Sequence, residues 1–245
     1  MAVSLVRSRF WKVAGLGLAL IAFVSLILLG NWQLRRLAWK EDLLATIEAR
    51  LAAPPVPLAD IEAIHATGGD IEYRPVTVSG TFEHDGEQDY FATYEGQSGY
   101  YIYTPQRLAD GRAIFVNRGF VPFDRKNRAS RAEGEVSGPA IVTGLARGAP
   151  QRKPSFLVPE NDPAQNIFYW KDLAAMRQAA GLDAAETVPF FIDANDAPNP
   201  GGLPVGGVTR ISFPNDHLQY AITWYGLAVA LAVTVALLYG RGRRS

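Results

Sequence analysis

The sequence contains no cysteine and only two methionines, Met1 and Met176. Without cysteine there can be no disulfide, no thiolate nucleophile and no C-x-x-C-H attachment site for c-type haem. The soft sulfur ligands that copper carriers use are missing as well. These absences exclude a copper chaperone on ligand chemistry alone.

Histidine and net charge are also scarce. Three histidines, His65, His84 and His217, stand far apart, and no His-x-x-x-His pair or comparable metal spacing occurs, so we expect no metal catalysis. The 24 basic and 24 acidic side chains cancel, which leaves no overall basic field to hold nucleic acid phosphates. We therefore expect no nucleic acid partner.

Two long segments lack charged side chains. Residues 13–30 are long enough to nearly cross a bilayer as a helix, and Trp11 and Trp32 flank them as interface anchors. A signal peptide is the competing interpretation, because a basic leader precedes the segment, but the run is long and no small-residue cleavage site follows it. Residues 220–239 form the second predicted span, and Arg241, Arg243 and Arg244 follow it.

The positive-inside rule predicts the topology. The arginines after the second span place that end in the cytoplasm, so both tails, 1–12 and 240–245, are expected inside. Residues 31–219 then form one extramembrane domain, and residues 31–53 continue the first helix outward because Leu37, Leu44 and Leu51 repeat at helical spacing. Prolines at 54, 55 and 57 end this helix.

The extramembrane segment alternates in hydrophobicity over several short stretches. Strands are expected at 74–82, 88–94, 100–108, 113–121, 139–147, 166–170 and 187–193. Short helices are expected at 59–65 and 171–180, and the segment 197–207, rich in proline and glycine, is expected to be a linker back to the membrane. The predicted fold class is α+β, with two terminal transmembrane helices flanking a mainly antiparallel, curved sheet.

Catalytic patterns are weak in this sequence. Ser98 lies in a segment that superficially resembles a nucleophile elbow, but the G-x-S-x-G register fails. The carboxylates Glu83, Asp85, Glu87 and Asp89 crowd one hairpin, and a solvated turn explains them more simply than an acid and base pair. No catalytic residue is predicted, and a hydrolase remains only as a contrasting hypothesis.

The candidate binding residue is His217, at the start of the second span. It is either a plain helix-entry residue at the interface or a ligand for an apolar molecule that needs one imidazole, such as haem. Tyr220 and Trp224 follow three and seven residues later and so share its helical face, although an aromatic interface belt explains them too. At the same membrane level the first helix carries Trp32, Gln33, Arg35 and Arg36, whose arginines can pair with haem carboxylates.

Four phrases of the sequence are distinctive: GNWQLRRLAWK (30–40), HLQYAITWYGLA (217–228), YRPVTVSGTF (73–82) and VNRGFVP (116–122). They resemble the surfeit locus protein one family of cytochrome c oxidase assembly factors. The two-helix layout agrees as well, so the similarity covers nearly the whole chain. Phe120 is one departure, because many members have tryptophan there.

The resemblance implies that the protein is not an enzyme but assists maturation of a haem-copper oxidase of the aa3 type. It implies transient binding of haem a, with His217 as the axial ligand of the iron and Tyr220, Trp224, Trp32, Arg35 and Arg36 around it. The expected partners are the catalytic subunit of cytochrome c oxidase, haem a synthase and membrane lipid. A haem-independent scaffold that holds an oxidase subunit during assembly is the alternative.

The expected location is a bacterial cytoplasmic membrane, with the main domain in the periplasm. The N-terminal leader is short and lacks the long Arg/Ser-rich presequence of an imported mitochondrial precursor.

Overall fold

In the computed structural model the chain forms two units, and the structure describes residues 2–209 and 215–241. The first unit, here called the helix pair, comprises Met1–Thr46 and Ser212–Ser245. The second, the barrel domain, comprises Ile47–Ile211.

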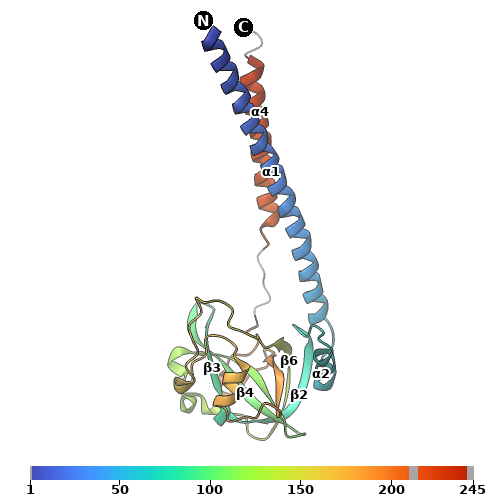
Figure 1. The fold of residues 1–245 in the computed structure, drawn as a ribbon. Coiled ribbons are helices and arrows are strands. Elements are labelled where there is room, and N and C mark those ends of the chain that lie inside the picture. The colour runs from blue at the N-terminus through green and yellow to red at the C-terminus, as the bar shows by residue number, and fades with distance from the viewer. Residues whose placement is uncertain (1, 210–214, 242–245) are drawn as a thin grey trace. The chain divides into compact units, whose positions relative to one another are not determined.

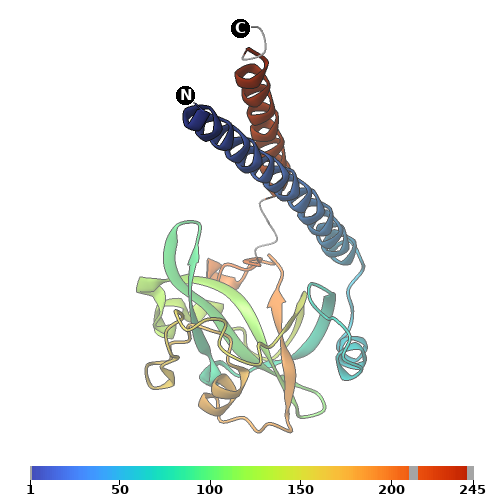
Figure 2. The ribbon, with the colours of Figure 1, turned by 45° about the horizontal axis from the view of Figure 1, so that its top comes forward.

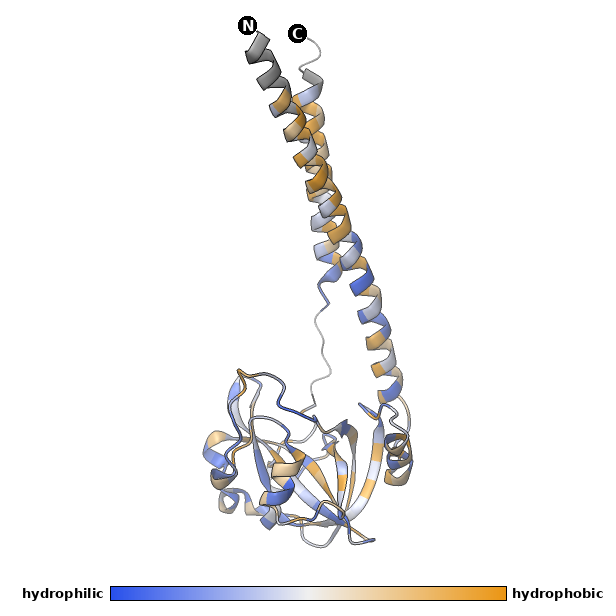
Figure 3. Cartoon of the chain, viewed as in Figure 1, coloured by the Kyte–Doolittle hydropathy of each residue, from blue (hydrophilic) through white to orange (hydrophobic). Residues whose placement is uncertain are grey.

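The helix pair consists of α1, Ala2–Leu51, and α4, His217–Arg241. Both helices are long and apolar enough to cross a membrane, and apolar residues predominate in α4 and in the stretch of α1 before its more polar C-terminal half (Figure 3). Side chains such as Leu20 and Val229 are each 62% exposed. Water would solvate such surfaces poorly, whereas lipid chains cover them at no cost, so the chain is a membrane protein with two spanning helices.

The predicted spans, 13–30 and 220–239, lie within these helices, and α1 continues without interruption through the expected extension as far as Leu51. Arg241 is the last residue of α4, while Arg243 and Arg244 lie outside the described residues.

The barrel domain contains seven strands (Figures 1 and 2). They are β1 Val56–Pro57, β2 Pro75–Phe82, β3 Gln88–Tyr94, β4 Gln97–Leu108, β5 Ala113–Pro122, β6 Pro139–Gly148 and β7 Thr187–Ala194. Their order is β1-β2-β6-β7-β5-β4-β3, and a further pairing of β2 with β4 closes β2, β6, β7, β5 and β4 into a barrel. The pairs β1–β2 and β5–β7 are parallel and the others antiparallel. The α+β prediction with a mainly antiparallel, curved sheet is thus confirmed.

Two short helices cover parts of this sheet. The helix α2, Leu58–Ala66, buries Ile61 completely within the core formed by strand side chains such as Val76 and Phe190. The helix α3, Leu173–Ala179, begins where the Asp172 side chain accepts a hydrogen bond from the backbone of Ala175, and it buries Met176 in a second cluster. Burial of each such side chain stabilises the fold by roughly 1.5 to 3 kcal/mol.

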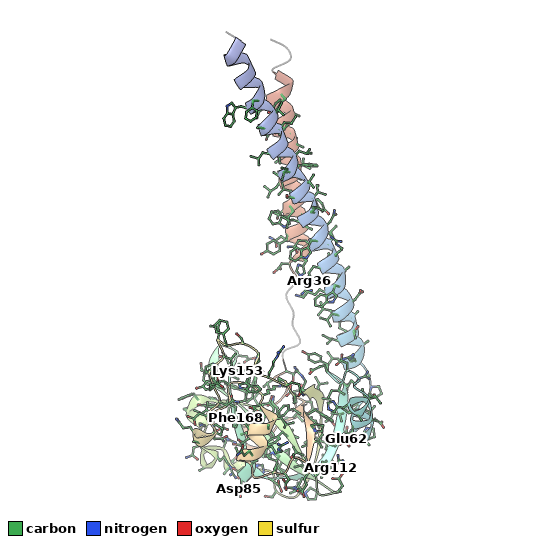
Figure 4. All side chains as sticks on the ribbon, in the orientation of Figure 1. Arg36, Glu62, Asp85, Arg112, Lys153 and Phe168 are labelled. Atoms are coloured by element: carbon green, nitrogen blue, oxygen red, sulfur yellow. The ribbon has the colours of Figure 1, made fainter. Side chains whose placement is uncertain are left out.

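The predicted strand at 166–170 is not a strand. Phe168 makes a single bridge, in which its carbonyl accepts from Phe91 N at 2.7 Å and its own N–H donates to Asp89 O at 2.9 Å. Asn166 adopts a left-handed backbone with φ 50°, which breaks the extended run, and the apolar character of the segment instead reflects a fully buried ring (Phe168 in Figure 4).

The segment 197–207 is packed on the barrel and is not the linker that its composition predicts. Val205 and Phe120 exchange two backbone hydrogen bonds of 2.8 Å, and Asn199 donates to Pro204 O and Arg118 O. Gly119 makes this approach possible, since it has φ 126° and a Cβ built on it would lie 2.0 Å from Val205 O.

Candidate functional site

The candidate site lies where α4 begins in the helix pair. His217 is the first residue of α4, and its Nδ1 lies 2.7 Å from Oε1 of Gln33, a residue of α1 that is 8% exposed. With the amide oxygen as acceptor, Nδ1 carries the proton and donates it. In the neutral imidazole with its proton on Nδ1, Nε2 carries the lone pair, which is the form in which an imidazole binds a metal.

Small residues and one further hydrogen bond hold the two helices together next to this pair. The Tyr225 hydroxyl donates to Asn31 Oδ1 at 2.7 Å, and its ring lies against Gly30, where a Cβ would come within 2.6 Å of Cε1. Ala221 and Ala228 are each 1% exposed. Close contact through glycine and alanine, with polar side chains between the backbones, is typical of helix association in membranes.

Two of the predicted aromatic residues lie on α4 with His217. Trp224 is half-buried, and its buried Nε1 has no hydrogen-bond partner within the part of the chain that the structure describes. Tyr220 is 55% exposed, so it lies outside the contact between the helices. Of the two aromatic residues predicted on the helical face of His217, Trp224 is therefore partly buried and Tyr220 is mostly exposed.

The predicted residues of α1 are exposed on the surface of the helix pair. Trp32 is 53% exposed, and Arg35 and Arg36 are exposed too. The Arg36 guanidinium lies 3.8 Å from the centre of the Trp39 ring (Figure 4). Neither arginine has a carboxylate within 4 Å among the described residues, so both keep donors for an external anion.

Gln33 is the residue whose importance the sequence did not reveal. It stands between Trp32 and Leu34 in a polar exit segment, and nothing in its spacing distinguishes it from its neighbours. A glutamine next to an apolar span is a usable signal only once the opposite helix and its register are known.

The acidic hairpin of the barrel domain is an ion-pair cluster. Glu83 pairs with Arg107, Asp85 with Arg128, and Glu87 with the buried Arg131, while Asp89 lies 3.8 Å from Lys126 (Asp85 in Figure 4). Each of the four carboxyl groups thus has a basic side chain within 4 Å. Ser98 is exposed in β4, and no group of three potential metal ligands occurs in residues 2–209 and 215–241.

A second polar cluster surrounds Asp193 in β7. Its carboxylate accepts from Asn117 at 3.0 Å, Arg147 at 3.1 Å and Thr209 at 2.9 Å, and Lys171 Nζ lies 3.9 Å away. Burial lowers the pKa of Lys171. These contacts satisfy both carboxylate oxygens and join the barrel strands to residue 209, which is a structural role.

Comparison with known proteins supplies the context for these two units. The model of the SURF1 family matches residues 20–229, a span that contains both Gln33 and His217. Surfeit locus protein 1 of Rattus norvegicus is 40% identical over 220 residues, which is 82% of this chain and 68% of that protein, and the Homo sapiens protein is 39% identical over 220 residues, with 82% and 70% covered. A SURF1-like protein of Monosiga brevicollis is 39% identical over 231 residues, with 89% of this chain and 85% of that protein covered.

Proposed function

Because the chain belongs to the SURF1 family, whose members act in cytochrome c oxidase assembly, we propose that it binds haem a and passes it to the catalytic subunit of the oxidase. His217 is the axial ligand of the iron in this proposal, and haem a is a cargo that the protein holds transiently. The role requires no bond to be made or broken in a substrate, so the protein acts as a chaperone and not as an enzyme.

The hydrogen bond between His217 and Gln33 carries the proposal. Histidines that bind metals nearly always donate their second N–H to an acceptor, which fixes the tautomer and the ring orientation. Gln33 supplies this acceptor from the opposite helix at 2.7 Å, and its burial keeps water from replacing it. An imidazole that served only as a helix-entry residue would not need a buried partner on α1.

The surroundings of His217 suit an amphipathic macrocycle. Trp224 offers an apolar ring and an indole N–H that has no partner among the described residues, and the exposed Tyr220 and Trp32 add aromatic surface close to His217 and Gln33 in the sequence. Arg35 and Arg36 have no carboxylate partners among the described residues and are suited to pair with haem carboxylates. A single protein ligand makes the binding reversible, because an acceptor that offers two histidines binds the iron more strongly.

The test is haem content after purification. The full-length protein is produced in cells that make haem a and is purified in detergent, and its absorption spectrum and pyridine haemochrome are measured. We expect bound haem a in the unchanged protein and background absorption for His217→Ala. Gln33→Leu removes the acceptor but keeps the ligand, and it is expected to lower the affinity for haem a by about 10- to 100-fold, the usual effect of losing such a partner, and so to reduce the haem content.

His65→Ala is the matched control. His65 lies in α2 of the barrel domain, where its ring contacts Phe190 at a centroid distance of 5.5 Å, and its loss should leave the haem content unchanged. Equal haem content in His217→Ala and His65→Ala would refute His217 as the ligand.

A haem-independent scaffold is the alternative function. The two membrane helices and the closed barrel are sufficient for such a role, because neither needs a cofactor to bind a subunit. Co-purification with the catalytic subunit distinguishes the two. A scaffold retains the oxidase subunit in His217→Ala while no variant contains haem a, whereas a haem carrier loses its haem and its support of oxidase activity together.

The proposed location is a bacterial inner membrane, with both termini in the cytoplasm and the barrel domain in the periplasm. The cysteine-free sequence makes this simple to test, because one cysteine introduced at Phe156, which is 89% exposed, is the only thiol present. A membrane-impermeant maleimide should label it in intact spheroplasts. Labelling only after the membrane is broken would place the barrel domain in the cytoplasm and refute this topology.

A further inference from the structure

Two of the described arginines are buried, and they differ in one respect. Arg131 is 5% exposed and pairs with Glu87, whose Oε2 accepts from Nη1 at 3.1 Å. Arg118 is 2% exposed and has no carboxylate within 4 Å in the described part of the chain. Arg118 is therefore a buried cation with no carboxylate in direct contact among the described residues.

The neutral partners of Arg118 use only part of its hydrogen-bonding capacity. Its Nη2 donates to Gly134 O and to Asn199 Oδ1, the latter at 3.0 Å, whereas Nη1 is buried and has no acceptor among the residues described. The Phe82 ring lies 4.8 Å from Cζ and covers one face of the guanidinium. A buried donor without a partner costs about 1 to 3 kcal/mol, and more when it belongs to a charged group.

The charge itself is also penalised at this position. Burial lowers the pKa of Arg118 to about 10, and neighbouring Glu87 and Glu135 only partly oppose this change. The side chain nevertheless stays protonated near neutral pH. A permanently charged and incompletely paired group is expensive to keep unless something outside the chain pairs with it.

Arg118 lines a cavity of about 300 Å³ that lies entirely within the barrel domain. Phe82, Ile141 and Pro198 are among its apolar lining residues, and Asn195 and Asn199 add amide groups. Ile141 is 75% exposed, so the cavity reaches the surface. Its volume is at the lower end of the range for small-molecule sites.

We propose that this cavity binds a small carboxylate with an apolar body, and that Arg118 pairs with the carboxylate. The planar guanidinium matches a carboxylate geometrically, and the apolar body replaces water on Phe82 and Ile141. A phosphate fits less well, since it carries more negative charge than a carboxylate near neutral pH while Arg118 is the one cation among the lining residues. The carboxylate can belong to a free acid or to the C-terminus of a peptide.

A purely structural role is the competing explanation. Through Nη2, Arg118 joins Gly134 to Asn199 and thereby connects two loops. This accounts for Nη2, but it explains neither why Nη1 lacks an acceptor among the described residues nor why Arg118 lines a cavity. The same two carbonyl groups could be reached by a neutral donor without the cost of burying a charge.

The experiment compares carboxylates with their amides on the full-length protein in detergent. Butyrate and butyramide are water-soluble probes of equal size, and N-acetyl-Gly-Leu with a free or an amidated C-terminus represents a chain end. Binding is measured by isothermal titration calorimetry and saturation-transfer NMR. We expect at least one carboxylate to bind with a 1:1 ratio and its amide to bind about tenfold more weakly or worse, the effect of losing one charged hydrogen-bonding pair.

Variants at two positions make the result specific. Arg118→Met keeps much of the side-chain volume and should abolish the preference for carboxylate over amide. Ile141→Lys and Ile141→Asp change an exposed residue beside the cavity and should strengthen and weaken carboxylate binding respectively, which keeps the proposal testable if Arg118→Met fails to fold. Selective binding of butyrate identifies a free acid as the ligand, and selective binding of the peptide identifies a chain end.

Three outcomes would overturn the proposal: no saturable binding of any carboxylate, equal affinity for acids and amides, or insensitivity to both Ile141 substitutions. None of these measurements involves haem, so they are independent of the role of His217.

Discussion

Replacing Gly119 by alanine should destabilise the barrel domain strongly. Gly119 lies in β5 with φ 126°, and a Cβ at this position would lie 2.0 Å from Val205 O. The carbonyl belongs to the segment 197–207 that packs against β5, so the clash is with backbone. Backbone yields less readily than the flexible end of a side chain.

The magnitude follows from two contributions. A non-glycine residue forced to this φ costs about 1 to 3 kcal/mol. Moving Val205 away breaks the two 2.8 Å hydrogen bonds that it exchanges with Phe120, each worth roughly 0.5 to 1.5 kcal/mol. The expected loss is therefore about 2 to 6 kcal/mol, a large part of the stability of an ordinary domain.

Gly111→Ala is the control that separates strain from collision. Gly111 also has a positive φ, 87°, but a Cβ there would have nothing within 4 Å. Its cost should be about 1 to 2 kcal/mol, the backbone term alone. Thermal unfolding of the full-length protein in detergent measures both, and each kcal/mol corresponds to roughly 2 to 4 °C for a domain of this size. If the two variants unfold within about 1 kcal/mol of each other, the packing of Val205 on Gly119 does not contribute to stability.

Two further predictions concern other parts of the protein. Burial, and to a smaller extent the charge of Glu87, raises the pKa of Asp89 to about 7. Between about pH 4 and pH 7 the folded protein therefore keeps a proton that the unfolded chain releases. The free energy of unfolding should fall as the pH rises through this range. Asp89→Asn should flatten this dependence, and an unchanged pH profile in urea titrations would contradict the assignment. Gly30→Val should push the Tyr225 ring away and widen the distribution of distances between spin labels on α1 and α4. Gly17→Val is the control, because a Cβ at Gly17 would have no atom within 4 Å. Equal distributions in the two variants would rule out close packing at Gly30.

Local sequence patterns predicted most of the strands because apolar and polar residues alternate within each strand, whatever its neighbours in the sheet. The expected strand at 88–94 coincides with β3, and the expected strand at 113–121 ends one residue before β5 does. The long apolar runs without charge predicted both membrane helices for the same reason. Such features depend on neighbours in the chain, and no distant contact is needed to recognise them.

Pairing between distant strands could not be read in this way. The parallel pair β5–β7 joins strands that are separated by β6, and the β2–β4 pairing that closes the barrel follows from the curvature of the sheet. The segment 197–207 was predicted to be a linker because proline and glycine usually mark loops. It packs on the barrel because Gly119 leaves space for its backbone, which is information carried 86 positions away from Val205.

The candidate site follows the same division. His217 and its aromatic neighbours were found from helical spacing, whereas the pairing of His217 with Gln33, 184 positions away, was found only through the contact between α1 and α4. Gln33 and Arg118 both lie in phrases on which the family resemblance rests. What sets them apart from the other polar residues of those phrases is that each is buried and hydrogen-bonded to a residue far away in the sequence. The Gln33 oxygen accepts a hydrogen bond from His217, while Arg118 lines a cavity and keeps a buried donor without a partner among the described residues. Burial makes an incompletely paired charge costly to keep, so Arg118 indicates where a second ligand is to be sought.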